Sequence, residues 1–247
     1  MAKLLIVDES TIVCAVFKEL LEKCDCFDYE IVQSYADAKN LLKQKRYEYA
    51  VVSRTLPDAK NGEIIALFNK YNIAPIVYTS ELNEELIESF ESANIVEYIL
   101  RHRFDNVEQV LKRLKQLQEN KNIKIIIVHD SAIYRHYLKN SLAMHNFKVL
   151  AVSSAHKVIH KLELHSDTSL VIVDTHLKES NGMDAIELVK YIRKLERENL
   201  KVLALTYESH SYETSCFLNE GADDYLLDDA SKDEFYVRVY QNLKTSC

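Results

Sequence analysis

Glycine, proline and tryptophan are scarce or absent in this sequence. Its 247 residues include three glycines, two prolines and no tryptophan, whereas an average protein contains roughly 7% glycine and 5% proline. This scarcity excludes collagen-like sequences and long flexible linkers, and it disfavours all-β folds, which need many turns. The hydrophobic fraction of 47% is nevertheless ordinary for a folded protein with a core.

Excess positive charge and long apolar runs are also lacking. The formal net charge is −7, so the sequence has no basic surface for nucleic acid. No apolar run approaches the roughly 18 residues of a membrane span, and acidic residues interrupt the N-terminus before a signal peptide could form. Five scattered cysteines are typical of reduced thiols. We therefore expect a cytoplasmic protein that binds neither nucleic acid nor membranes.

The chain contains an internal repeat. LLIVDES at 4–10 recurs as IIIVHDS at 125–131, and three later apolar runs recur in the same order. Equivalent positions lie 121 residues apart in the first half of each copy and 127 apart in the second. One insertion near 190–199 explains the change. We interpret the chain as two copies of one domain, residues 1–120 and 121–247.

Short, continuously apolar runs alternate with amphipathic segments in each copy. Such runs are typical of parallel strands that are covered on both faces. The segments at 10–24 and 131–145 each open with a serine after an acidic residue, which predicts N-caps at Ser10 and Ser131. The fivefold alternation predicts an α/β protein with two flavodoxin-like, doubly wound (βα)5 domains.

Polar residues follow the predicted strands of both copies. Ligands of doubly wound sheets bind beyond the carboxyl ends of the strands, so each copy is expected to gather its set in one small cleft. The first copy has Asp8, Glu9, Ser53, Thr79 and Arg101, and the second has His129, Asp130, Asp174, Thr206 and Asp228.

This ordered set resembles the receiver domain, the phosphoacceptor module of bacterial two-component response regulators, twice over nearly the whole chain. In that family an acidic pair follows the first strand, Asp the third, Thr the fourth and Lys the fifth. The resemblance implies that the acids hold Mg²⁺ and that the metal and Lys neutralise the phosphoryl charge during transfer to the central Asp. The Thr hydroxyl binds the phosphoryl group and signals to an aromatic residue on the fifth strand.

For the second copy, the resemblance implies specific roles at the matching positions. Asp174 would be the phosphoacceptor, Thr206 the phosphoryl-binding residue and Tyr225 the switch aromatic residue. Asp130, Asp174 and the backbone carbonyl of His176 would bind Mg²⁺.

The second copy also departs from the family pattern. His129 replaces the first acid, and Asp228 replaces the lysine, which puts a negative charge where a cation is expected. Two interpretations stay open: phosphorylation of Asp174, or a second pseudo-receiver with vestigial acids.

The first copy departs at its phosphoacceptor. Ser53 stands at that position, and a serine hydroxyl has no anionic oxygen for attack on phosphorus. Arg101 replaces the lysine, whereas Asp8, Glu9 and Thr79 match the family. We expect a pseudo-receiver that is not phosphorylated.

The implied partner is a sensor histidine kinase or a phosphotransfer protein. Tandem receivers with one degenerate copy often precede a diguanylate cyclase domain, so the resemblance implies the regulatory half of a cyclic di-GMP signalling protein. Any cyclase activity would then lie in an output domain outside this sequence. The alternative is a structural adaptor or dimerisation module that needs no phosphorylation. A flavoprotein is disfavoured because no glycine-rich phosphate loop follows the first strand.

The family also implies a homodimer. Its dimers commonly use the fourth helix, fifth strand and fifth helix, which correspond to 211–220, 223–227 and 231–243 in the second copy. The equivalent segments of the first copy are 81–90, 96–100 and 104–120. Aromatic side chains beside charges of both signs suit an isologous contact, unless they only pack inward and leave a monomer.

Overall fold

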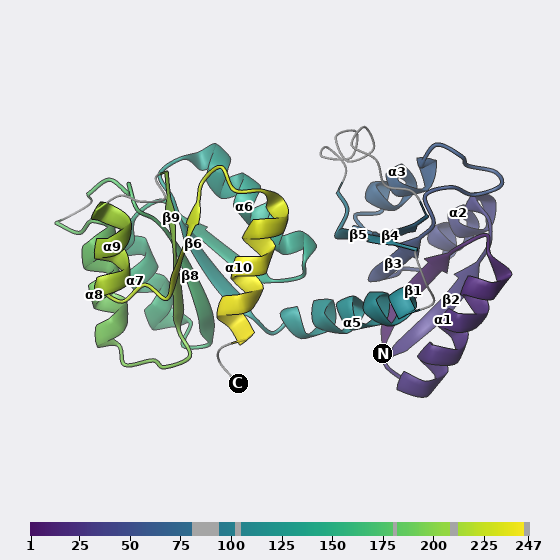
Figure 1. The fold of residues 1–247 in the computed structure, drawn as a ribbon, viewed down its shortest axis with the longest axis horizontal. Helices are drawn as coiled ribbons and strands as arrows, with labels where there is room; N and C mark the ends of the chain where they lie inside the picture. Colours follow the sequence, from purple (N-terminus) through teal and green to yellow (C-terminus); the bar gives the residue numbers. More distant parts are fainter. Residues whose placement is uncertain (81–93, 102–104, 180–181, 208–211, 245–247) are drawn as a thin grey trace. The chain divides into compact units, whose positions relative to one another are not determined.

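The computed structural model describes residues 1–80, 94–101, 105–179, 182–207 and 212–244. The chain divides into two compact units, Met1–Gln118 (unit 1) and Glu119–Cys247 (unit 2). Each unit has one sheet of five parallel strands (Figure 1). In the described ranges, no helix is long and apolar enough to cross a membrane.

Unit 1 has the strand order β2-β1-β3-β4-β5. The strands are β1 (Ala2–Val7), β2 (Phe27–Val32), β3 (Tyr49–Val52), β4 (Ile76–Thr79) and β5 (Glu97–Leu100). The helices are α1 (Thr11–Cys24), α2 (Tyr35–Gln44), α3 (Glu63–Lys70) and α5 (Asp105–Asn120). The 81–90 segment of the predicted dimer face lies outside the described residues.

Unit 2 repeats this topology, with the order β10-β9-β8-β6-β7. Its strands are β6 (Lys124–Val128), β7 (Lys148–Val152), β8 (Thr168–Asp174), β9 (Lys201–Thr206) and β10 (Asp224–Leu227). Its helices are α6 (Ala132–Met144), α7 (Ala155–Leu164), α8 (Ala185–Lys194), α9 (Tyr212–Asn219) and α10 (Lys232–Lys244). The predicted fold class is confirmed.

The sheets are apolar on both faces, as the continuous apolar runs predict. Successive residues of a strand point to opposite faces. Leu4 and Ile6 of β1 pack in a cluster with residues of α1 and α5, whereas Leu5 and Val7 pack with residues of α2 and α3. All four side chains are fully buried, and each such burial stabilises the fold by about 1.5–3 kcal/mol.

Serine caps place the first helix of each unit directly after the first strand. Ser10 Oγ accepts the backbone N–H of Val13 at 3.3 Å, and Ser131 Oγ accepts that of Tyr134 at 3.3 Å. Both predicted caps are confirmed. The polar residues between strand and cap are thereby fixed at the carboxyl edge of the sheet.

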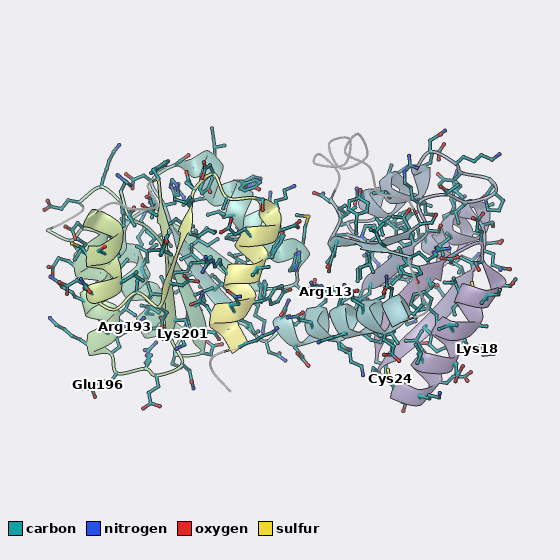
Figure 2. All side chains as sticks on the ribbon, in the orientation of Figure 1. Lys18, Cys24, Arg113, Arg193, Glu196 and Lys201 are labelled. Carbon is teal, nitrogen blue, oxygen red and sulfur yellow. The ribbon has the colours of Figure 1, made fainter. Side chains whose placement is uncertain are left out.

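Arg193 of α8, which is labelled in Figure 2, anchors the loop before β10. Its guanidinium donates to the Leu200 carbonyl at 2.8 Å and the Gly221 carbonyl at 2.5 Å, and it pairs with Asp223. Gly221 has φ +112°, and a Cβ there would lie 2.7 Å from Arg193 Cγ, so the turn requires glycine. This anchor sets the start of the strand that ends beside Asp228.

Candidate functional site

The predicted site residues lie at the carboxyl ends of neighbouring strands in both units. In unit 1, the Ser53 N–H donates to Val7 of β1 at 2.7 Å, and the Arg101 N–H donates to Thr79 of β4 at 2.7 Å. In unit 2, the Asp228 N–H donates to Thr206 at 2.8 Å. Asp174 is the last residue of β8, next to β6 and β9. Each unit therefore has one polar edge at the place expected for a doubly wound sheet.

Asp8 and Arg101 form a buried ion pair in unit 1. The Asp8 side chain is 2% exposed and the Arg101 side chain 20%. Asp8 Oδ1 accepts the Ser10 N–H at 2.9 Å, while Oδ2 pairs with Arg101 Nη2. The same Nη2 donates to the Tyr78 carbonyl at 3.2 Å, and the guanidinium carbon lies 4.8 Å from the centre of the Tyr78 ring. One arginine thus contacts β1 and β4 from the end of β5.

Opposing influences act on the Asp8 carboxyl. Burial raises its pKa, and the Arg101 charge lowers it without fully offsetting the burial. The thiol of Cys14 donates to the Asp8 carbonyl at 3.3 Å. Burial, followed by the Asp8 charge, raises the pKa of this thiol, so Cys14 stays protonated and is a poor nucleophile.

The other unit 1 residues do not complete a metal site. Ser53 Oγ donates to the Thr55 carbonyl at 2.9 Å, and Thr79, the last residue of the neighbouring strand β4, is buried. Glu9 is exposed, and its backbone carbonyl accepts from Gln33 Nε2 at 3.2 Å. Because Arg101 takes the Asp8 carboxylate and Ser53 is uncharged, the residues of unit 1 do not fit Mg²⁺, which prefers carboxylates.

In unit 2, His129 and Asp174 are buried side by side. His129 Nδ1 accepts the Ser131 N–H at 3.0 Å and lies 3.3 Å from Asp174 Oδ2. Asp174 Oδ1 accepts the His176 N–H at 2.9 Å. His129 Nδ1 therefore contacts both the Ser131 backbone and the Asp174 carboxylate. His129 thus accepts a hydrogen bond from the backbone two residues later, as Asp8 does, but it does not carry the negative charge of a carboxylate.

Asp130 retains a carboxylate for a cation. Its Oδ2 accepts the Lys178 N–H at 3.2 Å. Arg135, which the sequence interpretation missed, donates to the backbone carbonyls of Asp130 at 2.7 Å and His129 at 2.5 Å. The Asp130 and Asp174 carboxylates and the His176 carbonyl are oxygen ligands of the type that Mg²⁺ prefers. Over the described ranges, no three His, Cys, Asp or Glu residues are placed to hold a metal.

Asp228 stands where unit 1 has Arg101. Its Oδ1 is buried and has no hydrogen-bond partner in the part of the chain that the structure describes. The Tyr134 hydroxyl donates to its backbone carbonyl at 3.0 Å. Burial, and then the charges of Asp228 and Asp174, raise the pKa of the Tyr207 phenol. The Asp174 site therefore has an acidic neighbour in place of the expected cation.

Two tyrosine rings contact histidines of the unit 2 site. The His129 and Tyr134 ring centres lie 4.7 Å apart, and those of His176 and Tyr207 lie 5.1 Å apart. Tyr134 and Tyr207 were not singled out from the sequence, although the repeat register aligns them with the small residues Val13 and Ser80. The presence of a tyrosine in one copy and a smaller residue at the matching position of the other was the sequence signal for both tyrosines.

Tyr225, the predicted switch residue, and its counterpart in unit 1, Tyr98, lie on the last strand of each sheet. Tyr98 of β5 packs against the core cluster that includes α2 and α3, and burial raises the pKa of its phenol. Tyr225 of β10 packs against the cluster that includes α7 and α8. Thr206 is fully buried. The roles of Thr206 and Tyr225 in switching stay predictions.

Comparisons with known proteins agree with this geometry. The response regulator receiver domain family matches residues 125–240. The chemotaxis protein CheY1 of Helicobacter pylori is 29% identical over 107 residues, which cover 42% of this chain and 84% of that protein. The transcriptional regulatory protein TctD of Salmonella typhimurium is 30% identical over 50% of this chain and 53% of its own length.

Solved structures extend the likeness to both units. A two-component system response regulator/GGDEF domain protein superposes with a TM-score of 0.83 and 23% identity, covering 100% of this chain and 99% of the other. A second structure with a similar description also has a TM-score of 0.83, with 24% identity. At these identities the likeness concerns the fold. Unit 2 therefore belongs to the response regulator receiver family of two-component signalling, and the chain contains the receiver fold twice.

Proposed function

We propose that unit 2 accepts a phosphoryl group on Asp174 from a sensor histidine kinase or phosphotransfer protein. The observation that carries the proposal is the buried Asp174 carboxylate at the end of β8, next to the strand that leads to Asp130, within the unit that the receiver family matches. Unit 1 would act as a pseudo-receiver for assembly, because Ser53 offers no carboxylate.

Each site residue of unit 2 would have a separate role in phosphoryl transfer. An Asp174 oxygen would attack phosphorus as the bond to the donor's imidazole nitrogen breaks, and that imidazole would retain the bonding electron pair. Asp130, Asp174 and the His176 carbonyl would hold Mg²⁺, which supplies positive charge for the phosphoryl oxygens. The Thr206 hydroxyl would bind one of those oxygens, and Tyr225 would respond to its movement.

Beryllofluoride, which mimics the phosphoryl group, tests this function. With Mg²⁺, the ¹⁹F NMR spectrum should show one bound adduct in the wild-type chain and none in Asp174→Asn. A wild-type chain that binds none would contradict phosphorylation and leave the adaptor alternative.

The adaptor alternative has its own supporting observation. Asp228 has a buried carboxylate oxygen without a partner in the described ranges, and its charge opposes an incoming phosphoryl group. In that case unit 2 would serve, like unit 1, as a binding surface only.

We further propose that the module is a cytoplasmic homodimer that controls an output domain of the diguanylate cyclase type. For the type of output domain, support comes from the two similar structures, both described as response regulator/GGDEF domain proteins. Sedimentation with and without beryllofluoride tests the dimer. A monomer in both conditions up to roughly 100 μM would contradict it, because a weaker interface is worth less than about 6 kcal/mol.

A further inference from the structure

We propose that Arg101 is a built-in cation of unit 1, which takes the place of both the metal ion and the lysine of a receiver and fixes unit 1 in one state. The inference rests on the proposed role of unit 1 as a receiver that is not phosphorylated. It adds a physical reason why that unit would neither need nor accept a metal.

The guanidinium of Arg101 is one positive charge at the place where a receiver has two, the metal ion and the lysine. Arg101 follows β5, at the lysine position, yet its guanidinium reaches Asp8 after β1, at the position of the acidic pair. Arg101 Nη2 also donates to the Tyr78 carbonyl on the intervening β4 at 3.2 Å. A single side chain therefore joins the ends of three strands, a task that the metal, the phosphoryl group and the lysine share in a phosphorylated receiver.

Burial makes this arrangement hard to displace. With side-chain exposures of 2% for Asp8 and 20% for Arg101, solvent and salt screen the pair weakly. The Tyr78 ring, 4.8 Å from the guanidinium carbon, adds a cation–π contact. A metal ion that bound Asp8 would have to separate this pair and leave the guanidinium without its acidic partner, which is unfavourable for buried charges.

The same two positions in unit 2 show that the fold does not impose the pair. His129 and Asp228 occupy them, and His129 Nδ1 contacts Ser131 and Asp174. Asp228 Oδ1 lacks a partner within the described residues. The built-in cation is therefore a feature of unit 1, which lacks the phosphoacceptor, and is not a general property of this sheet.

Two substitutions in the full chain test the inference. In an Asp174→Asn background, which removes the unit 2 acceptor, Ser53→Asp is compared with Ser53→Asp/Arg101→Lys. The probe is Mn²⁺, read as paramagnetic broadening of backbone amide signals around residues 8–10 and 53. We expect Ser53→Asp alone to leave unit 1 without a Mn²⁺ site and the double variant to bind Mn²⁺ at least tenfold more tightly.

Equal Mn²⁺ affinity in the two variants would overturn the inference, as would a folded double variant with no site in unit 1. If the double variant does not fold, hydrogen exchange in the wild-type chain decides. Protection of β1 and β5 amides should then be unchanged by Mg²⁺ and beryllofluoride, and a change there would overturn the inference. A wild-type unit 2 without a beryllofluoride adduct would contradict only the proposed phosphorylation.

Discussion

At the ends of the first and fifth strands, unit 1 places Asp8 and Arg101, whereas unit 2 places His129 and Asp228. The acidic residue follows the first strand in unit 1 and the fifth strand in unit 2, and the nitrogen-containing side chain takes the other position in each unit. In unit 1 the two side chains meet in a buried ion pair, but in unit 2 His129 turns to Asp174 and Ser131. One sheet topology thus supports a charge-neutral pair and an acidic site.

The comparison shows that the receiver fold does not depend on its phosphorylation residues. Both sheets are held by apolar residues on two faces, and the caps at Ser10 and Ser131 are alike. The polar edge is therefore free to differ between units, and the differences decide which chemistry each unit can support.

The largest expected difference between the units is in phosphorylation. Incubation with acetyl phosphate and Mg²⁺ should give at most one labile adduct in intact-mass analysis, because only Asp174 offers a buried carboxylate at the acceptor position. Asp174→Asn should abolish the adduct, and the matched variant Ser53→Ala should retain it. An adduct that maps to unit 1 would break the comparison.

The buried pair of unit 1 gives the next largest effect. Arg101→Met should lower the free energy of unfolding of unit 1 by about 3–5 kcal/mol, because Asp8 would be left as an uncompensated buried charge. Adding Asp8→Asn to this variant should restore most of the lost free energy of unfolding. Hydrogen exchange of unit 1 amides measures both, and Arg46→Met on the exposed surface should change little. A small loss in Arg101→Met would show that the pair is not important for stability.

The pH dependence of the same variant sharpens this test. Burial raises the pKa of Asp8, and Arg101 opposes that rise, so Arg101→Met should raise the pKa further. For an acid whose folded-state pKa is raised, the stabilising contribution is full below the unfolded value and is lost as the pH rises through the folded value. Arg101→Met should therefore destabilise unit 1 less in mildly acidic solution than at neutral pH. Equal destabilisation at both would contradict a charged, buried Asp8.

The sequence predicts the two sheets and the residues at their strand ends because these depend on local patterns. Continuous apolar runs mark buried strands, and the spacing of 121 and 127 residues aligns the two copies. Ser10 and Ser131 follow acids in the way that N-caps do. None of these inferences requires knowledge of where a side chain points.

The contacts among the polar residues are not predictable in the same way. Asp8 and Arg101 are 93 residues apart, and only the folded sheet shows that the guanidinium reaches past the ends of β4 and β3. A tyrosine near a strand or helix end is usually a packing residue. Tyr134 and Tyr207 were missed for that reason, and only the folded sheet shows the rings beside His129 and His176.

A moderate effect is expected from reversing the charge at the end of β10. Asp228→Lys should tighten Mg²⁺-dependent beryllofluoride binding by about 1 kcal/mol or more, since a positive charge replaces a negative one at an effective dielectric constant of about 20. The exposed neighbour Asp229 supplies the control, because Asp229→Lys makes the same charge change farther from the site. Fluorine NMR titration measures both. Unchanged or weaker binding in Asp228→Lys would mean that this carboxylate does not act on the Asp174 site.

The smallest effect should follow from restoring an acid at position 129. An aspartate there is expected to accept the Ser131 N–H as Asp8 accepts that of Ser10, because His129 Nδ1 and Asp8 Oδ1 make matching contacts at 3.0 and 2.9 Å. The added charge would lie close to Asp174, one of the residues proposed to hold Mg²⁺, so His129→Asp should strengthen Mg²⁺ binding by about 0.5 kcal/mol, roughly twofold. His129→Asn makes a neutral control that keeps a polar side chain without the charge. Titration calorimetry at fixed ionic strength measures the two affinities. If both variants bind Mg²⁺ equally, the charge at this position has no effect on the metal, and the contrast between units depends on Asp228 and Arg101 alone.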